Sequence, residues 1–250
     1  MPKKSSVKIP AIAIIRLIVF LFIGFVLFSI YSRTRDFLTN DPMFDVKDVL
    51  VDQSIRFIDE RPLKALKGEN IFSIDLKRLH RQIVHQYPQI AQLRIVRQLP
   101  NTIKVLAKKR DILLQVQTKG KYLIVDTEGV TMFYTGQPLS VPLVRGVPIE
   151  RRQVVLGTAS SMKELNLVVN LFHQLKSHPY TSRLRVLSVE AGNLSKVAFT
   201  VMPNIQIIID EDDLAAQVNM LEILLQNGKV NWGQVKYIDI RFREPIINAS

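Results

Sequence analysis

The sequence has 250 residues, of which 47% are hydrophobic and 22% charged, and this composition excludes an intrinsically disordered chain. Cysteine is absent, which excludes disulfides, thiolate metal sites and a cysteine nucleophile. The formal net charge of +12 favours an anionic partner. The excess of positive charge is uneven, because residues 1–117 carry 20 basic and 10 acidic side chains whereas residues 118–250 carry 14 and 12.

A long apolar segment lies near the start of the chain. From Ile9 to Tyr31 the sequence carries one charge, Arg16, which lies close enough to the end of the segment to reach lipid headgroups. As a helix the segment spans about 34 Å, enough for a hydrocarbon core of about 30 Å. Its last residues are too large for a signal-peptidase site. We therefore expect an uncleaved membrane anchor, and not a cleaved signal peptide or the buried helix of a soluble protein.

The charges that flank this segment predict its orientation. Three lysines in the first eight residues and Arg16 precede or enter the span, whereas Arg33, Arg35 and Asp36 follow it. The positive-inside rule favours a cytoplasmic N-terminus by a narrow margin. We expect a single-pass type II protein with nearly all of its folded mass outside the cytoplasm. This location argues against nucleic-acid binding in spite of the basic charge.

Hydrophobic patterning after the anchor and a polar linker first predicts a small mixed unit. An alternating strand and a short helix are followed by a longer helix, which Ser73 or Asp75 can cap and Pro88 ends. Two strands joined by the turn Leu99-Pro100-Asn101 complete a strand-helix-helix-strand-strand unit. The expected elements are strands over 44–51, 92–98 and 102–108, and helices over 62–66 and 76–87.

From Ile112 onward short strands separated by turn signals predict a larger sheet with two helices. The first helix has Ser161 and Glu164 at capping-box spacing, and Asn227-Gly228 ends the second. A stretch rich in proline and glycine, 136–148, is expected to be irregular. The expected strands are 112–117, 122–126, 130–134, 184–190, 196–201, 205–210 and 235–242, and the expected helices are 162–176 and 214–226.

No group of residues in the sequence predicts catalysis. The four histidines form two pairs five residues apart, which is the wrong spacing for metal ligation from one helix face. We interpret them as solvated or capping side chains. The acidic run Asp210–Asp213 precedes a helix, where carboxylates meet free N–H groups, so capping is favoured over metal binding. With no phosphate-binding glycine loop and no nucleophile elbow, we expect a binding protein with no cofactor, metal or small-molecule substrate.

Five short motifs in order along the chain resemble the FtsQ/DivIB family of bacterial cell-division proteins. The first motif lies at the start of the longer helix of the small unit, and the second forms the hairpin of that unit. The third lies in the first strands of the larger sheet, the fourth is a Leu-x-Val-Pro segment after them, and the fifth is the final strand. The residues that carry the resemblance are 70–76 (NIFSIDL), 87–105 with Ile95, Val96, Arg97, Pro100 and Val105, 123–130 (LIVDTEGV), 139–146 (LSVPLVRG) and 236–242 (KYIDIRF).

The resemblance covers residues 1–247 and implies an α+β protein with an anchor, a POTRA domain and a β-domain. Two positions depart from the family pattern, since Lys109–Leu113 replaces its Glu-Arg-x-Pro segment and Asp52 stands where glycine is usual. Because of these departures, the resemblance does not identify a partner that binds the small domain. The implied domains are a cytoplasmic tail (1–8), a transmembrane helix (9–31), a linker (32–43), a POTRA-like domain (44–112), a β-domain with a larger antiparallel sheet flanked by two helices (113–247) and the C-terminal end (248–250).

Family membership implies a non-enzymatic scaffold of the division machinery in the inner membrane at the septum. Its outer domains would bind the FtsB/FtsL pair of small single-pass proteins and help to assemble septal wall synthesis. Two other classes compete with this reading: a POTRA-bearing factor for protein export or envelope assembly, and a membrane-anchored hydrolase. The first usually carries repeated POTRA units and a barrel, and the second needs convergent catalytic side chains.

The C-terminal segment 242–248 (FREPIIN) is the candidate partner-binding site. It follows the last expected core strand, and Pro245 removes a donor, as edge strands tolerate. We expect a partner to extend this edge by backbone hydrogen bonds. The alternatives are that the preceding strand is an ordinary core strand and that the segment is a frayed tail. The expected contact residues are Arg241, placed for a charge-assisted contact, Phe242, Glu244 and Ile246.

Overall fold

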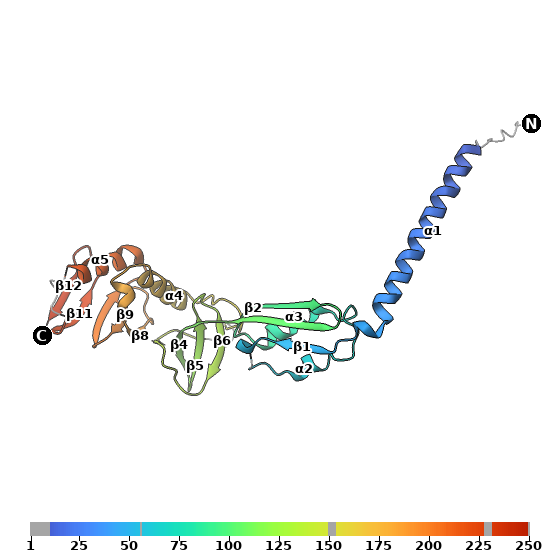
Figure 1. Cartoon of the computed structure of the whole chain (residues 1–250). Helices are drawn as coiled ribbons and strands as arrows, with labels where there is room; N and C mark the ends of the chain where they lie inside the picture. Colours follow the sequence, from blue (N-terminus) through green and yellow to red (C-terminus); the bar gives the residue numbers. More distant parts are fainter. Residues whose placement is uncertain (1–10, 56, 150–153, 228–231, 250) are drawn as a thin grey trace, which may run out of the picture. The chain divides into compact units, whose positions relative to one another are not determined.

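The computed structural model describes residues 11–55, 57–149, 154–227 and 232–249 (Figure 1). The chain divides into two compact units. The described residues up to His80 belong to the first unit together with Leu93–Leu106, and the second unit contains Arg81–Gln92 and Ala107–Ser250. The mixed α+β class with an N-terminal apolar helix and a larger sheet domain is confirmed.

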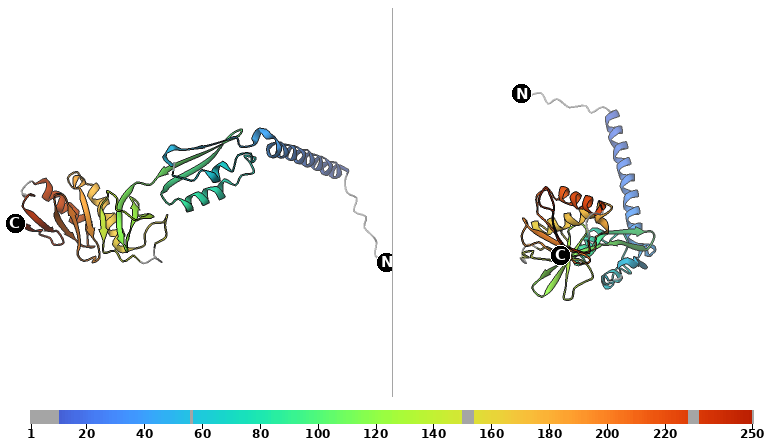
Figure 2. Two further views of the ribbon diagram at one scale, coloured as in Figure 1. Left: turned by 90° about the horizontal axis from the view of Figure 1, so that it is seen from below. Right: turned by 90° about the vertical axis from the view of Figure 1, so that its left-hand side faces the viewer.

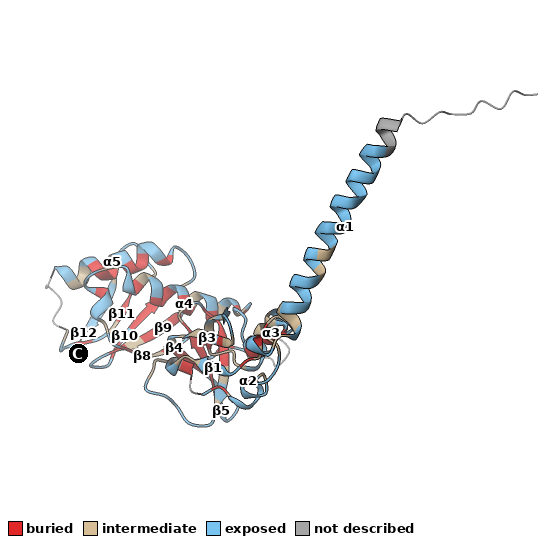
Figure 3. Cartoon of the chain, turned by 45° about the vertical axis from the view of Figure 1, so that its right-hand side comes forward, coloured by how far each residue is buried: buried red, intermediate tan, exposed pale blue. Residues whose placement is uncertain are grey.

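The N-terminal helix α1 runs from Ala11 to Asn40. It is the one helix in the described part of the chain that is long and apolar enough to cross a membrane, and its side chains from Ile15 onward are mostly exposed (Figure 3). The linker expected over 32–43 is helical as far as Asn40. No proline lies between Ala11 and Asp41, whereas Pro42 disfavours helical backbone at the residue before it.

The end of α1 packs onto the first unit through aromatic rings. Phe37 meets Phe44, in the 3₁₀ helix η1 (Pro42–Phe44), edge to face with ring centroids 5.5 Å apart. Phe44 meets Phe72 in the same manner at 5.2 Å. The Asn70 side-chain amide donates a hydrogen bond to the Leu38 carbonyl oxygen at 2.9 Å. These contacts tie α1 to the rest of its unit.

The smaller sheet has the strand order β1-β3-β2. The two helices that the pattern predicted, α2 and α3, come between β1 and β2, so the expected strand-helix-helix-strand-strand order is confirmed. Asp75 caps α3 by accepting a hydrogen bond from the Arg78 backbone N–H at 3.0 Å. The elements are β1 (Asp48–Val51), the 3₁₀ helix η2 (Gln53–Ile55), α2 (Arg61–Lys64), α3 (Leu76–Gln86), β2 (Ile90–Gln98) and β3 (Thr102–Lys109).

β1 pairs in parallel with β3, and the pairing places Val49 beside Ile103 and Val51 beside Val105. Ile103 and Val105 are fully buried, so this face of β3 forms the centre of the small core. Arg97, from the family-like hairpin, donates hydrogen bonds to the carbonyl oxygens of Ile71 and Ile74, both at 2.7 Å. This guanidinium therefore holds the segment that leads into α3.

The larger sheet has nine strands in the order β12-β11-β10-β9-β8-β7-β4-β5-β6. The family resemblance implied an antiparallel sheet, but β4–β7, β7–β8 and β10–β11 pair in parallel. The last of these is explained by the helix between β10 and β11, because a crossover helix returns the chain in its original direction. The strands are β4 (Ile112–Thr118), β5 (Lys121–Asp126), β6 (Thr131–Thr135), β7 (Leu143–Arg145), β8 (Val186–Glu190), β9 (Val197–Val201), β10 (Ile205–Ile209), β11 (Val235–Asp239) and β12 (Ile246–Ala249).

Helices α4 (Lys163–Lys176) and α5 (Leu214–Gln226) lie on the same side of this sheet (Figures 1 and 2), and the 3₁₀ helix η3 (Thr181–Arg183) follows α4. The main core lies between them and the strands, where Leu165, Phe199 and Val218 are buried. Asp213 caps α5 by accepting from the Ala216 N–H, which confirms the capping interpretation of the acidic run. The capping box expected at α4 is wrong, since its N-cap is Met162 and no side chain caps it.

Candidate partner-binding edge

The C-terminal strand β12 forms one end of the nine-stranded sheet. It pairs antiparallel with β11, and the pairing places Ile246 beside Asp239 and Ile247 beside Ile238. β11 in turn lies between β12 and β10, so it is an interior strand. Among the described residues β12 has a strand neighbour on one side only. Its outer backbone groups are therefore open to a further strand.

An ion pair between Arg241 and Asp239 shapes the loop between β11 and β12. Arg241 donates to Asp239 with Nε at 2.9 Å and Nη2 at 2.6 Å, a two-point contact that fixes the guanidinium plane. A third nitrogen, Nη1, donates to the Ser195 carbonyl oxygen at 3.0 Å. The guanidinium also lies 5.3 Å from the ring centroid of Phe242. The loop is thus anchored to β11 and to the turn before β9.

The electrostatics of this pair follow from its geometry. The hydrogen bonds that the Arg241 side chain donates lower the pKa of Asp239 below its ordinary value, and the nearby positive charge of Lys196 adds to this. Desolvation by burial acts in the opposite direction and is outweighed. The same hydrogen bonds raise the pKa of Arg241. Both groups are therefore charged at neutral pH.

The structure brings three of the four predicted contact residues together around this pair. Phe242 lies against Arg241 with half of its surface exposed, and Ile246 is 50% exposed beside Asp239. Glu244 is exposed in the loop. The segment 242–248 is not one continuous strand as expected, because residues 242–244 bend and β12 begins at Ile246. Arg241 is also not a free cation, since Asp239 and Ser195 already occupy it.

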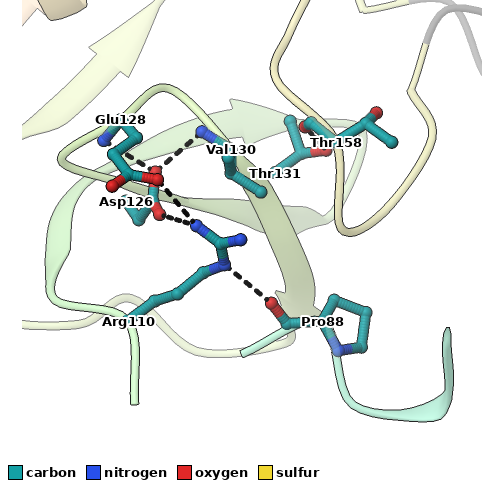
Figure 4. A network of polar contacts seen from close by, with 7 residues as sticks. All are labelled: Pro88, Arg110, Asp126, Glu128, Val130, Thr131 and Thr158. Atoms are coloured by element: carbon teal, nitrogen blue, oxygen red, sulfur yellow. Dashed lines mark hydrogen bonds and ion pairs between the residues drawn. The ribbon is translucent and has the colours of Figure 1, made fainter. Parts of the chain in front are cut away.

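A second polar network lies at the β5–β6 hairpin of the same unit (Figure 4). Arg110 Nη1 donates to Asp126 Oδ2 at 2.6 Å and to Glu128 at 3.2 Å. Its Nε donates to the Pro88 carbonyl oxygen at 3.1 Å, and its backbone N–H donates to the Gln89 carbonyl oxygen at 2.9 Å. Arg110 therefore fastens the residues just before β2 to the β5–β6 turn.

The carboxylate at the centre of this network is almost completely buried. The other oxygen of Asp126 accepts from the backbone N–H groups of Glu128 and Val130, at 2.8 and 2.7 Å, and so fixes the turn that Gly129 completes. The sequence showed Asp126 only as part of a turn motif and Arg110 only as a departure from the family pattern. An arginine directly after a strand, opposite an Asp-x-x-Gly turn, was the signal that could have identified the pair.

One hollow of the second unit shows no catalytic arrangement among its described lining residues. A hollow of about 550 Å³ beside α4 is lined mainly by apolar side chains with Lys176 and Arg185, and no described carboxylate or histidine lines it. His80 Nε2 and His178 Nδ1 lie within hydrogen-bond distance of backbone carbonyl oxygens. Within the described ranges no three His, Asp or Glu residues are placed to hold a metal.

Comparison with known proteins agrees with this architecture. Residues 60–110 match the family model described as "POTRA domain, FtsQ-type", which lies inside the region where the POTRA-like domain was expected. The chain is also 22% identical over 211 residues to "Cell division protein DivIB" of Clostridium acetobutylicum, a similarity that covers 81% of this chain and 81% of that protein. The FtsQ-type domain match and the similarity to DivIB agree with the resemblance of the sequence motifs to the FtsQ/DivIB family of cell-division proteins.

Proposed function

We propose that the protein is a non-enzymatic scaffold that binds FtsB/FtsL-like division proteins at the septum and helps to assemble septal wall synthesis. The observation that carries this proposal is the open edge of β12 at the end of the nine-stranded sheet. An added strand would bind there by backbone hydrogen bonds, which need correct register more than particular side chains. The DivIB relative supports the setting in cell division.

The anchor supports a location at the bacterial inner membrane. With residues 1–8 in the cytoplasm and residues 32–250 outside, the protein would be a type II single-pass protein. The positive charge before and within the first part of the span favours this orientation. β12 would then face the same compartment as the outer parts of other single-pass division proteins.

The side chains around β12 supply contacts beyond the backbone. Ile246 and Phe242 offer exposed apolar surface on either side of Glu244, and Arg241 holds Phe242 in place. Arg241 acts here as a positioning residue. Arg241→Glu would place a carboxylate beside Asp239, so it should disorder the loop as well as change the charge that the partner meets.

The test measures binding of the full-length chain in detergent to the FtsB/FtsL-like pair of the same organism by calorimetry. A form ending at Phe242 lacks β12 and should lose binding. Ile246→Pro should weaken binding by about tenfold or more because it removes a backbone donor, whereas the matched control Ile246→Ala keeps the donor and should weaken it less. Undiminished affinity in the form that ends at Phe242 would remove this edge from consideration.

A further inference from the structure

The outer face of α5 carries no charge. Solvent-facing positions of a helix that covers a core normally bear charged or strongly polar side chains. The single charged residue within α5, Glu222, is buried and accepts hydrogen bonds from the backbone N–H groups of Tyr180 and Thr181. Ile223 is 47% exposed. The exposed positions of α5 are Ala215, Ala216, Asn219, Ile223 and Gln226.

The neighbouring helix shows that the fold does not require this composition. α4 covers the same side of the sheet, and its exposed positions include Lys163, His173 and Lys176. A matched pair of helices on one sheet therefore differs in the charge of its outer faces. The uncharged face is the one over the end of the sheet that carries β11 and β12 (Figures 1 and 3).

A row of apolar side chains runs across the sheet to β12. Phe199, Ile207, Ile238 and Ile247 are successive register partners across β9, β10, β11 and β12. The first three are fully buried in the core, whereas Ile247 is 39% exposed. This row of side chains under the helices therefore ends at the sheet edge with Ile247, which is partly exposed.

The size of the β12 edge points to the same surface. Stable protein interfaces bury about 1,200–2,000 Å² and use about 20 or more residues on each side. β12 has four residues, and the exposed loop before it adds only a few more. A partner bound through β12 alone would fall short of this area, so it needs further surface beside the strand, and burial of an uncharged face carries no penalty for desolvated charge.

We propose that the outer face of α5, together with Ile247, is a second docking surface for the same partner that extends β12. This inference rests on the proposed function. The partner contributes an amphipathic segment next to its added strand, with apolar side chains toward Ile223 and Ile247 and few charges in the contact. A partner with a charged segment at this position is disfavoured, because its charges would be desolvated without partners.

The test compares single substitutions in the full-length chain, with the FtsB/FtsL-like pair of the same organism as the probe. Ile223→Glu places a charge at the centre of the α5 face and should weaken binding by about tenfold or more. Val84→Glu makes the same change at an exposed apolar position of α3 and should leave binding unchanged. Thermal unfolding of both variants verifies that they fold as the wild type does.

A second measurement does not depend on a charged variant. The chain has no cysteine, so Ile223→Cys gives a single labelling site for an environment-sensitive fluorophore. Addition of the pair should shift the emission of this label to the blue, and a label on Val84→Cys should not respond. No response at position 223 together with wild-type binding by Ile223→Glu would overturn the α5 surface.

The experiment separates this surface from the β12 edge. If Ile246→Pro loses binding while Ile223→Glu retains it, the α5 surface is wrong and the β12 proposal stands. If Ile223→Glu loses binding while Ile246→Pro and the form ending at Phe242 retain it, partner docking on α5 stands and the β12 edge is wrong. Absence of binding by the wild type would overturn both.

Discussion

Asp239 receives hydrogen bonds from the backbone N–H, Nε and Nη2 of Arg241, and they lower its pKa in the folded protein. A carboxylate whose folded pKa lies below its unfolded value stabilises the fold above the unfolded pKa of about 3.9. That stabilisation is lost as the pH falls through the lowered folded value. We predict that Asp239→Asn lowers the free energy of unfolding at pH 7 by about 1–3 kcal/mol.

Asp59 provides a matched control for this prediction. It also accepts hydrogen bonds from an arginine two residues later, Arg61, but this pair is exposed. Urea unfolding of Asp239→Asn and Asp59→Asn at a series of pH values between 2 and 7 measures the difference. The Asp239 variant should show a flatter dependence on pH below about 4 than the wild type. Equal effects of the two substitutions at pH 7 would contradict the structural role of the Asp239–Arg241 pair.

Arg110 neutralises Asp126, which has 2% of its side chain exposed. Removing one member of a buried ion pair leaves the other charge desolvated and without its partner. Arg110→Ala should therefore lower the free energy of unfolding by about 3–5 kcal/mol. Chemical denaturation of the chain in detergent measures this change.

Arg145 and Glu190 form the comparison for this effect, since their ion pair of 3.0 Å is exposed. Arg145→Ala should cost about 0–1 kcal/mol, because water screens the pair and solvates the remaining carboxylate. A small effect of Arg110→Ala, similar to that of Arg145→Ala, would mean that the network around Asp126 does not hold the hairpin.

At the scale of elements, the end of β7 depends on one glycine. Gly146 has a φ of +80°, and a Cβ there would lie 2.6 Å from the backbone nitrogen and 2.8 Å from the Cα of Gly192. Backbone atoms cannot move aside as a flexible side chain can. We expect Gly146→Ala to destabilise the chain by about 2 kcal/mol or more, because the clash adds to the cost of the left-handed conformation.

Gly120 allows the cost of the left-handed conformation to be measured without the cost of a clash. Its φ is +75°, but no atom lies within 4 Å of the Cβ position. Gly120→Ala should cost only the conformational term, about 1–2 kcal/mol. Thermal unfolding of both variants gives the comparison, and an equal loss in the two would show that the approach of Gly146 to Gly192 is not tight.

The sequence predicted those elements whose own residues determine them. Helix α5 was expected over 214–226 and runs from Leu214 to Gln226, because apolar residues recur at helical spacing between an acidic cap and Asn227-Gly228. The strand-helix-helix-strand-strand order of the small unit could likewise be predicted from local sequence patterns. β7 was missed within 136–148, since a strand of three residues gives no periodic signal and forms only by pairing with β4 and β8.

The candidate site was predicted less completely than the fold. That the chain after the last core strand forms an edge could be inferred, because Pro245 removes a backbone donor there, as edge strands tolerate. The role of Arg241 could not, since its contact with Ser195 joins residues 46 positions apart. The expected strand over 242–248 was shortened for a related reason: the Asp239–Arg241 contact turns the chain, and β12 starts only at Ile246. Tertiary contacts of this kind leave no local pattern.

At the scale of the whole molecule, the orientation of α1 decides where both proposed docking surfaces lie. The absence of native cysteine allows single cysteines to report it. In intact cells a membrane-impermeant thiol reagent should label Leu187→Cys, an exposed position of β8, and should not label Ser5→Cys. Labelling of Ser5→Cys with protection of Leu187→Cys would reverse the proposed topology.

Depletion of the protein in its own organism, followed by microscopy, tests the central claim most directly. If the chain is a division scaffold that works through β12, depleted cells should form filaments without septa. Expression of the wild type should restore division, and a form ending at Phe242 should not. Continued septation after depletion, or a defect confined to protein export or envelope assembly, would contradict the account.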